Sequence, residues 1–430
     1  MHRTLQRFVL VVALAGVSCT PGSEPRDVDA VARDYVALVL ATGDHDPNFV
    51  DAYYGPEEIK TAAANDARTL VELREGALLL RGELAAIEPG DDAMDRLRHR
   101  YLDKQLAAAA ARIGMLLGET LRFDEETQRL YDAVAPAPDV DAYERALATI
   151  ERLVPGEGPL AARVEALRRE FVIPPDRLQS VFDRAIAECR DRTLRHIDLP
   201  EGERFTLEFV TDKPWSGYNW YQGDTYSLIQ VNTDLPIFID RAVDLGCHEG
   251  YPGHHTYNVL LERELAIERG WVEFTVYALF SPQSLIAEGS ANYGIDMAFP
   301  DDARYAFEEG VLMPLAHIPT ENAARYRALR EALAELDGAG NEAARRYLDG
   351  DWTRAQAIEW LVEYSLSSPE RAAQRVDFFD TYRGYVINYN LGRDRVEAYI
   401  QAHGDSEAER WRAFKELLGS PRLPSDLNPP

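Results

Sequence analysis

Three of the nine histidines in the chain lie in one short stretch, residues 244–258. The stretch reads Asp-Leu-Gly-Cys-His-Glu-Gly-Tyr-Pro-Gly-His-His-Thr-Tyr-Asn. In the H-E-x-x-H motif, two histidines one helical turn apart bind zinc, and the glutamate after the first histidine activates water. His248 and Glu249 supply the first half of such a motif, but His254 and His255 follow His248 by six and seven positions rather than four. The stretch therefore predicts a metal site on an irregular helix.

Pro252 determines how the two halves of this motif can meet. It lacks an N–H group, and its ring collides with the carbonyl of His248, so the helix must bulge. If residues 250–253 loop out, His254 occupies the place of the second ligand, one turn along. If the helix only kinks, His255 shares a face with His248 but lies roughly 10 Å away along the axis. We therefore prefer His254 as the ligand and keep His255 as the alternative.

A zincin centre needs a third protein ligand and leaves one position for the attacking water. Glu288 is the candidate, because it is a lone carboxylate among apolar residues with small neighbours at 287 and 289–291. Buried without a partner it would be costly, although an ordinary exposed glutamate is the alternative. It lies on a helix that Ser281 and Pro282 should begin, with a capping hydroxyl and a proline in the first position. The predicted metal ligands are thus His248, His254 and Glu288.

The elements that must position these residues are mostly helices. Apolar residues recur at three-to-four spacing from Asp27, a plausible N-cap, to Gly43, which should end the first helix. The same spacing predicts helices at about 68–86, 94–117, 139–153, 177–192, 281–297, 320–336, 342–348, 353–365 and 370–386. The fold class we expect is mainly α, a large helical zincin-like metallopeptidase domain.

Two segments before the histidine stretch alternate like β-strands, residues 204–210 and residues 226–232. We expect a small antiparallel β-sheet next to the metal-binding helix. The edge of 226–232 is a candidate surface for an extended substrate. Asn232 and the aromatic, glycine-containing run 217–220 are candidate lining residues.

The beginning of the chain has the features of an export signal. Arg3 and Arg7 precede an apolar run, residues 8–17, that is too short to span a bilayer. Small residues before Cys19 resemble the lipobox of bacterial lipoproteins, and cleavage near Ser18 of an ordinary secretory leader is the alternative. Both interpretations place the protein outside the cytoplasm, in the cell envelope or periplasm, with the membrane contacted only through a lipidated Cys19.

The predicted organisation follows from these features. We expect a signal peptide over 1–18, an anchor and linker over 19–26, a helical lobe over 27–200, a catalytic lobe with the metal site over 201–420, and a loose, proline-rich tail over 421–430.

Charge and cysteine content restrict the function further. The formal net charge is -27, which repels phosphate backbones and anionic lipids, so we expect no nucleic-acid partner. Besides Cys19, only Cys189 and Cys247 remain, and they are far apart in sequence. We expect both to be free thiols, with Cys247 serving as a small packing residue.

The run His-Glu-Gly-Tyr-Pro-Gly-His-His resembles the H-E-x-x-P-G-H-H hallmark of the bacterial domain of unknown function 885 family, which is grouped with zincin metallopeptidases. Its members are mainly helical and often carry lipoprotein leaders. The run from Glu288 to Tyr293 is similar to the family's Glu-Gly-Trp-Ala-Leu-Tyr segment, except at Ser290 and Asn292. The resemblance implies that Glu288 is the third metal ligand.

The resemblance extends to a tyrosine three residues before a glycine, which Tyr389 and Gly392 match. An arginine that the family carries later in this segment is replaced here by Ile400. Arg393 and Arg395 are the candidates to replace it. The family implies metallopeptidase-like chemistry but names no substrate.

We therefore predict an exported hydrolase with one Zn²⁺ ion that cleaves a peptide or another amide. Glu249 acts as the general base, and Tyr389, or Tyr385 in its place, donates a hydrogen bond to the oxyanion. One alternative is an esterase or a cell-wall amidase. Another is a metal-binding envelope protein without turnover, although such a protein has no need of Glu249.

Overall fold

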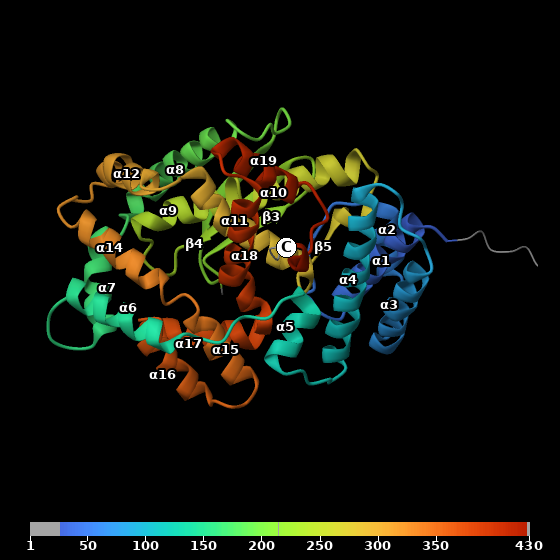
Figure 1. Ribbon diagram of the computed structural model, residues 1–430, viewed down its shortest axis with the longest axis horizontal. Coiled ribbons are helices and arrows are strands. Elements are labelled where there is room, and N and C mark those ends of the chain that lie inside the picture. The colour runs from blue at the N-terminus through green and yellow to red at the C-terminus, as the bar shows by residue number, and fades with distance from the viewer. Residues whose placement is uncertain (1–25, 214, 428–430) are drawn as a thin grey trace, which may run out of the picture.

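The computed structural model describes residues 26–213 and 215–427, and it is mainly helical, as the sequence predicts (Figure 1). The predicted leader and Cys19 lie outside the described residues. No helix in the described part of the chain has the length and apolar character needed to cross a membrane.

The α-helices run in the order α1 Val28–Gly43, α2 Glu57–Ala64, α3 Leu70–Ala85, α4 Ala93–Leu116, α5 Phe123–Tyr131, α6 Val140–Leu153, α7 Leu160–Arg168, α8 Leu178–Thr193, α9 Ile239–Leu245, α10 His254–Leu260, α11 Pro282–Ala298, α12 Ala303–Phe307, α13 Met313–Leu315, α14 Ala323–Ala334, α15 Ala339–Leu348, α16 Arg354–Tyr364, α17 Pro369–Tyr382, α18 Ile387–His403 and α19 Glu407–Leu418. Short 3₁₀ segments are η1 Arg169–Phe171, η2 Pro175–Arg177, η5 Val272–Thr275, η7 Arg383–Val386 and η8 Pro424–Leu427. The π-helical segments are η3 Gly246–Gly250, η4 Leu261–Ile267 and η6 Glu308–Leu312.

The predicted helices are present, with small shifts at their ends. Asp27 caps α1, because its side chain accepts a hydrogen bond from the backbone of Ala30, and α1 ends at Gly43. Pro282 begins α11, but the expected cap from Ser281 is wrong. The Ser281 hydroxyl is buried and has no hydrogen-bond partner among the described residues.

The strands are β1 Val50–Tyr53, β2 Arg204–Val210, β3 Gly217–Tyr221, β4 Tyr226–Asn232 and β5 Val276–Ala278. Strands β1 and β5, which the sequence pattern did not indicate, form an antiparallel pair. The second sheet has the order β2-β4-β3. Strand β3 pairs with β4 antiparallel, whereas β2 joins the other edge of β4 in parallel. A small sheet therefore lies before the histidine-bearing helix, as expected, but its central strand is β4.

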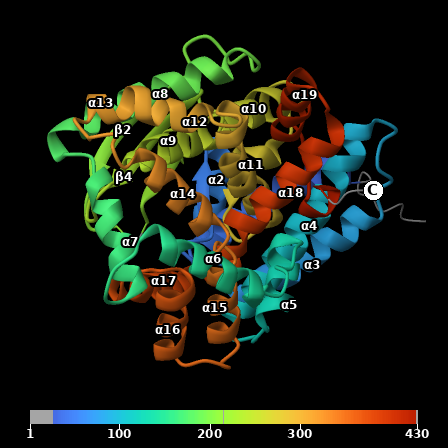
Figure 2. The same cartoon turned by 60° about the vertical axis from the view of Figure 1, so that its left-hand side comes forward.

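Helices α11 and α18 lie near the middle of the molecule, between two groups of helices (Figure 1). In Figure 1, helices α1 to α4 lie on one side, and α7, α8, α9, α12 and α14 lie on the other. The turned view again places α3 and α4 across α18 from α7, α8 and α9 (Figure 2). Two clusters of buried apolar side chains hold these groups together, and each cluster draws residues from both sides of position 200. The hydrophobic cores therefore do not follow a division of the chain at that point.

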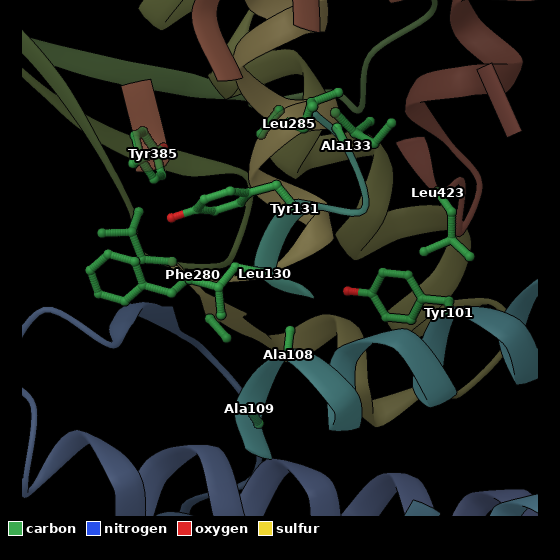
Figure 3. Close-up of a cluster of buried hydrophobic side chains, with 14 of the residues drawn as sticks. Tyr101, Ala108, Ala109, Leu130, Tyr131, Ala133, Phe280, Leu285, Tyr385 and Leu423 are labelled. Atoms are coloured by element: carbon green, nitrogen blue, oxygen red, sulfur yellow. The ribbon is translucent and has the colours of Figure 1, made fainter. Parts of the chain in front are cut away.

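The C-terminal segment packs on the first core, so the expectation of a loose tail is wrong for residues 421–427. Leu423 and Leu427 are buried, and Figure 3 shows Leu423 beside helix α4 in the same cluster as Tyr101. The apolar residues between the prolines supply the physical reason, because each gains burial when the tail lies against α4 and α18. Residues 428–430 lie outside the described part.

The close crossing of α11 and α18 depends on two glycines. A Cβ atom on Gly289 would lie 2.5 Å from the backbone of Gly392, and a Cβ on Gly392 would lie 2.9 Å from that of Gly289. Any side chain at either position would push the helices apart. The glycines therefore bring the residues that precede and begin α18 close to Glu288, the neighbour of Gly289.

We expect Gly289→Ala to lower the free energy of unfolding by roughly 1–3 kcal/mol, because the added methyl group overpacks the crossing. The control is Gly82→Ala, on the exposed face of α3, where a Cβ meets no atom within 4 Å. That change should stabilise the protein by about 0.5–1 kcal/mol through helix propensity. Urea unfolding followed by circular dichroism measures both. Equal effects of the two substitutions would contradict the close crossing.

Candidate metal centre

The predicted bulge in the helix that carries the histidines is present. Helix α9 continues into the π-helical turn η3, residues 251–253 break the helix, and α10 begins at His254. The peptide bond between Tyr251 and Pro252 is cis. At Gly253 only glycine fits, because a Cβ there would lie 1.8 Å from the carbonyl oxygen of His248. The break thus folds the chain back so that His254 returns to the side of His248.

His248, His254 and Glu288 converge on one point. The two imidazole rings lie 4.6 Å apart, edge to face. Nε2 of His248 is 3.2 Å from Oε2 of Glu288, and Nε2 of His254 is 3.7 Å from the same oxygen. The structure therefore brings together the three residues that the sequence proposes as metal ligands, from η3, α10 and α11.

Oε2 of Glu288 is buried and has no properly oriented hydrogen-bond donor, despite the two nearby histidine nitrogens. The other carboxylate oxygen, Oε1, accepts a hydrogen bond of 2.7 Å from the hydroxyl of Tyr385. A buried carboxylate oxygen without a donor costs free energy unless a cation lies next to it. Glu288 is thus held by one oxygen and left with the other oxygen facing the two histidines.

A hydrogen bond behind His248 fixes the orientation of its ring. Its Nδ1 lies 2.9 Å from Oδ1 of Asn292, and an amide oxygen can only accept, so Nδ1 carries the proton. The Nε2 lone pair of His248 therefore points at Glu288. Asn292 in turn donates to the backbone oxygen of Tyr389 at 3.0 Å. Asn292, one of the departures from the family pattern, is a supporting residue that the sequence did not identify.

The donor set fits a divalent cation such as zinc. Two ligands of a tetrahedral zinc, each bonded at about 2.0–2.1 Å, lie about 3.3–3.4 Å apart. The observed nitrogen-to-oxygen separations of 3.2 and 3.7 Å are close to that value. Without a cation or a proton between them, the lone pairs of two imidazoles and a carboxylate repel one another. Burial lowers the pKa of His254, but the adjacent carboxylate of Glu288 outweighs burial and raises the pKa to about 9.

The carboxylate of Glu249 lies beside the two histidines. One carboxylate oxygen of Glu249 and one nitrogen each of His248 and His254 lie within 4.8 Å of one another. Its side chain is buried against β3, where a Cβ on Gly217 would lie 2.8 Å from Oε1 of Glu249. Burial raises the pKa of Glu249 above its usual range, while the two histidines oppose this rise. A raised pKa suits a residue that must accept a proton and later release it.

Asp51 also lies at the site, although no motif or spacing in the sequence singles it out. It lies on β1, it accepts a short hydrogen bond from the hydroxyl of Tyr218, and its charge acts on His254. Burial raises the pKa of Asp51 to about 6, and the negative charges of Glu288 and Glu249 add to the effect. The neighbourhood of the two histidines therefore contains three carboxylates.

His255, the alternative ligand, points away from the centre. It is fully buried, and its Nδ1 lies 2.8 Å from the hydroxyl of Ser227. Its Nε2 lies 3.0 Å from Oε2 of Glu203, which also accepts a bond from the hydroxyl of Tyr251. Burial alone would raise the pKa of Glu203, but the bonds from His255, Tyr251 and Arg190 lower it to about 2. This network holds the two ends of the helix break and leaves His255 no role in a metal site.

Cys189 and Cys247 form a disulfide bond, so the expectation of two free thiols is wrong. Their Cα atoms lie 5.5 Å apart although 58 positions separate them in sequence. The reason is that α8 packs directly against η3, where a Cβ on Gly246 would lie 3.3 Å from the side chain of Ile186. The bond ties α8 to the residue immediately before His248.

The predicted lining residues divide into two groups. Gly217 and Asn219 face Glu249, and the Asn219 amide donates to the backbone oxygen of Glu249 at 2.7 Å. Asn232 does not line the site, because its amide bonds to the backbone oxygens of Lys213 and Trp215. The expectation that β4 offers a free edge is also wrong, because β2 and β3 occupy both of its edges.

Trp220 is partly exposed and bonds to Gln230 rather than to a residue of the site. Neither candidate for the missing family arginine is free. Arg393 pairs with Asp296 and Glu397, and Arg395 contacts the backbone oxygen of Pro424.

No family model and no curated protein matches this sequence. Among solved structures, the chain is similar to a putative lipoprotein from Colwellia psychrerythraea, with 14% identity over 84% of this chain and 68% of that one, and a TM-score of 0.49. It is also similar to a structure described as BsuCP, with 11% identity over 91% of this chain and 87% of that one, and a TM-score of 0.48. Likeness at this level concerns the course of the chain only.

We expect Asp51→Asn to stabilise metal-free protein at pH 7.5 by about 1–2 kcal/mol, allowing for the partial exposure of Asp51. Its pKa is about 6 in the folded protein, against 3.8 as the ordinary value. Between these values the folded state holds a proton that the unfolded state has lost, so stability falls as pH rises. The gain from Asn should therefore be near zero at pH 4 and complete above pH 6.

Urea unfolding in a chelator at several pH values measures this difference. Asp191→Asn, an exposed aspartate of α8 without a side-chain bond among the described residues, is the control and should change nothing. A gain from Asp51→Asn that is equal at pH 4 and pH 7.5 would exclude ionisation as its cause.

Proposed function

We propose that the protein is a zinc-dependent hydrolase that cleaves a peptide or a related amide. The observation that carries this proposal is the buried, donorless Oε2 of Glu288, towards which Nε2 of both His248 and His254 is directed. Three ligands from the protein leave a fourth position open, which is typical of catalytic rather than structural zinc. When bound, the ion polarises the scissile carbonyl and makes water more acidic.

Glu249 supplies the proton transfers. Its carboxylate takes a proton from the attacking water as the new C–O bond forms at the scissile carbon. It then returns the proton to the departing nitrogen as the C–N bond breaks, giving a carboxylate and an amine. The raised pKa caused by its burial favours the first transfer, and the contact with Gly217 and β3 keeps its side chain in place.

The two tyrosines have different roles in this proposal. The hydroxyl of Tyr385 already donates to Glu288, so it positions the ligand. No described group bonds to the hydroxyl of Tyr389, whose ring lies 5.8 Å from that of Tyr385. Burial raises the pKa of Tyr389 far above its ordinary value, so it keeps its proton and can donate to an oxyanion. We therefore assign oxyanion stabilisation to Tyr389.

The position of β3 supports an extended substrate. It is an edge strand of the three-stranded sheet, and Gly217 and Asn219 on this strand lie against Glu249. A peptide that adds to this edge would pass alongside Glu249. This arrangement favours a peptide over a compact ester, although the same groups would also hydrolyse an ester.

The disulfide bond supports an extracytoplasmic location, since such bonds form and persist in oxidising compartments. The sequence contains three cysteines, so pairing of Cys189 with Cys247 leaves Cys19 as the odd one. An odd cysteine at the end of an apolar leader is the residue that lipidation requires. We propose a lipid anchor at Cys19 and a location in the cell envelope.

We expect purified protein to contain about one zinc per chain, and His248→Ala to lose most of it, since one of three ligands is removed. Glu249→Gln should keep the zinc but lose peptide cleavage by roughly 10²–10⁴-fold, the usual contribution of a general base. Elemental analysis and a peptide-library screen, with ester and muropeptide substrates alongside, measure both. His45→Ala, at an exposed histidine of the N-terminal region, is the control. Full activity in Glu249→Gln would rule out the assigned base.

Asn292→Leu should weaken zinc binding about 10–100-fold, because it removes the acceptor that orients His248. Ser290→Ala on the same helix is the matched control, because Ser290 bonds only to the backbone of Ala287. Competition with a fluorescent chelator gives both affinities. If the two variants bind zinc equally well, the ring orientation of His248 does not depend on Asn292.

A further inference from the structure

Helix α17 carries two cations with no anionic partner in contact. The chain is strongly acidic, and its inward-facing arginines usually contact carboxylates, as Arg304, Arg330 and Arg345 do. Arg371 and Arg375 are half-buried, yet neither forms an ion pair or a side-chain hydrogen bond with any described residue. They lie one helical turn apart and therefore on the same face of α17.

A row of aromatic rings connects Arg375 to the candidate metal centre. The guanidinium carbon of Arg375 is 4.7 Å from the ring centre of Phe378, and that ring is 6.4 Å from the ring of Tyr389. Tyr389 lies next to Tyr385, which bonds to Glu288. The charge of Arg375 acts on Tyr389 directly. Arg375 is thus close to the proposed oxyanion-stabilising residue.

Stacking on aromatic rings leaves the N–H groups of Arg375 free of hydrogen bonds to other described side chains. A guanidinium has five N–H donors, and a cation–π contact uses none of them. Burial lowers the pKa of Arg375, and no described carboxylate contacts its guanidinium group. Such a group gains most from an anion that arrives with a ligand.

The surroundings of Arg371 also favour the binding of an anion. It lies in the first turn of α17, where the helix dipole is positive and a cation is unfavourable. The nearby charges of Arg168 and Arg241 repel it, and the one carboxylate that acts on it, Glu165, is beyond ion-pair distance. Arg241 is itself paired with Asp244, and its charge reaches Glu249. Arg371 therefore has other cations near it and no carboxylate in contact with it.

We propose that Arg371 and Arg375 form the binding site for a carboxylate group of the substrate, beside the candidate metal centre. This inference rests on the proposed function and defines its substrate class. The substrate is a peptide with a negative charge close to the scissile bond, carried either by a free C-terminus or by an acidic side chain. In a chain with a net charge of -27, such a local site is needed to overcome general repulsion of an anion.

The test measures equilibrium binding of four peptides that share one neutral sequence. The first has a free C-terminus, the second is amidated, the third is amidated with one internal glutamate, and the fourth is amidated with glutamine at that position. Titration calorimetry uses zinc-supplemented full chain carrying Glu249→Gln, so that binding does not require turnover. The same titrations are repeated in this background with Arg375→Gln, Arg371→Gln and Arg375→Lys.

We expect one of the two carboxylate-bearing peptides to bind about 10–100-fold more tightly than its neutral partner, as for hydrogen bonds to a charged group. Which peptide gains identifies the source of the carboxylate. Arg375→Gln should abolish this difference without weakening the neutral peptides, Arg371→Gln should reduce it, and Arg375→Lys should restore part of it. Arg410→Gln is the control, since Arg410 is half-buried on α19 and also lacks a side-chain bond to any described residue.

Equal binding of charged and neutral peptides, or an equal loss for both in a folded Arg375→Gln variant, would overturn the inference, as would no binding of any peptide. The two proposals fail separately. Charge-dependent binding by a wild-type protein that cleaves nothing would refute the hydrolase and keep the carboxylate site. Cleavage at a rate that does not depend on substrate charge would refute the carboxylate site and keep the hydrolase.

Discussion

The structure of this protein depends on one electrostatic constraint, the gathering of two imidazole nitrogens and a carboxylate oxygen in a space from which water is largely excluded. None of these atoms can satisfy the others without a proton or a cation between them. Three features of the chain bring these atoms together despite this cost. They are the π-helical turn η3, the break at 251–253 and the glycine crossing of α11 and α18. Each of these features departs from regular helical structure, and together they place the three side chains beside one another.

Support for these side chains comes from distant parts of the sequence. Asn292 orients His248, Tyr385 holds one oxygen of Glu288, and the Glu203 network fixes the turn between the two histidines. Because His248 and Glu288 are each held by a second residue, the directions of this ring and this carboxylate are set by the protein itself. Preorganisation of this kind distinguishes a site from a chance meeting of polar groups.

Local patterns were sufficient for much of this architecture. Helical periodicity located most of the helices, and the argument from Pro252 correctly required a bulge that favours His254 over His255. Features that depend on contacts between distant segments could not be read in this way. Asp51 lies on a four-residue strand whose partner is more than two hundred positions away, and the disulfide joins cysteines that only the packing of α8 on η3 brings together. Strand order also depends on contacts between distant segments. The sequence pattern therefore suggested a free edge on β4, which β2 in fact occupies.

The disulfide has a further consequence for the three-stranded sheet, whose strand β3 faces Glu249. The segment between Cys189 and Cys247 contains the whole three-stranded sheet, and its two ends are joined within 5.5 Å. Closing a loop of this length removes conformational freedom worth about 4 kcal/mol from the unfolded chain in the simple entropy model. The disulfide therefore joins the two ends of the segment that contains the sheet. If the hydrogen bonds of the sheet open transiently, the disulfide limits how far Gly217 and Asn219 can move from the turn that carries His248.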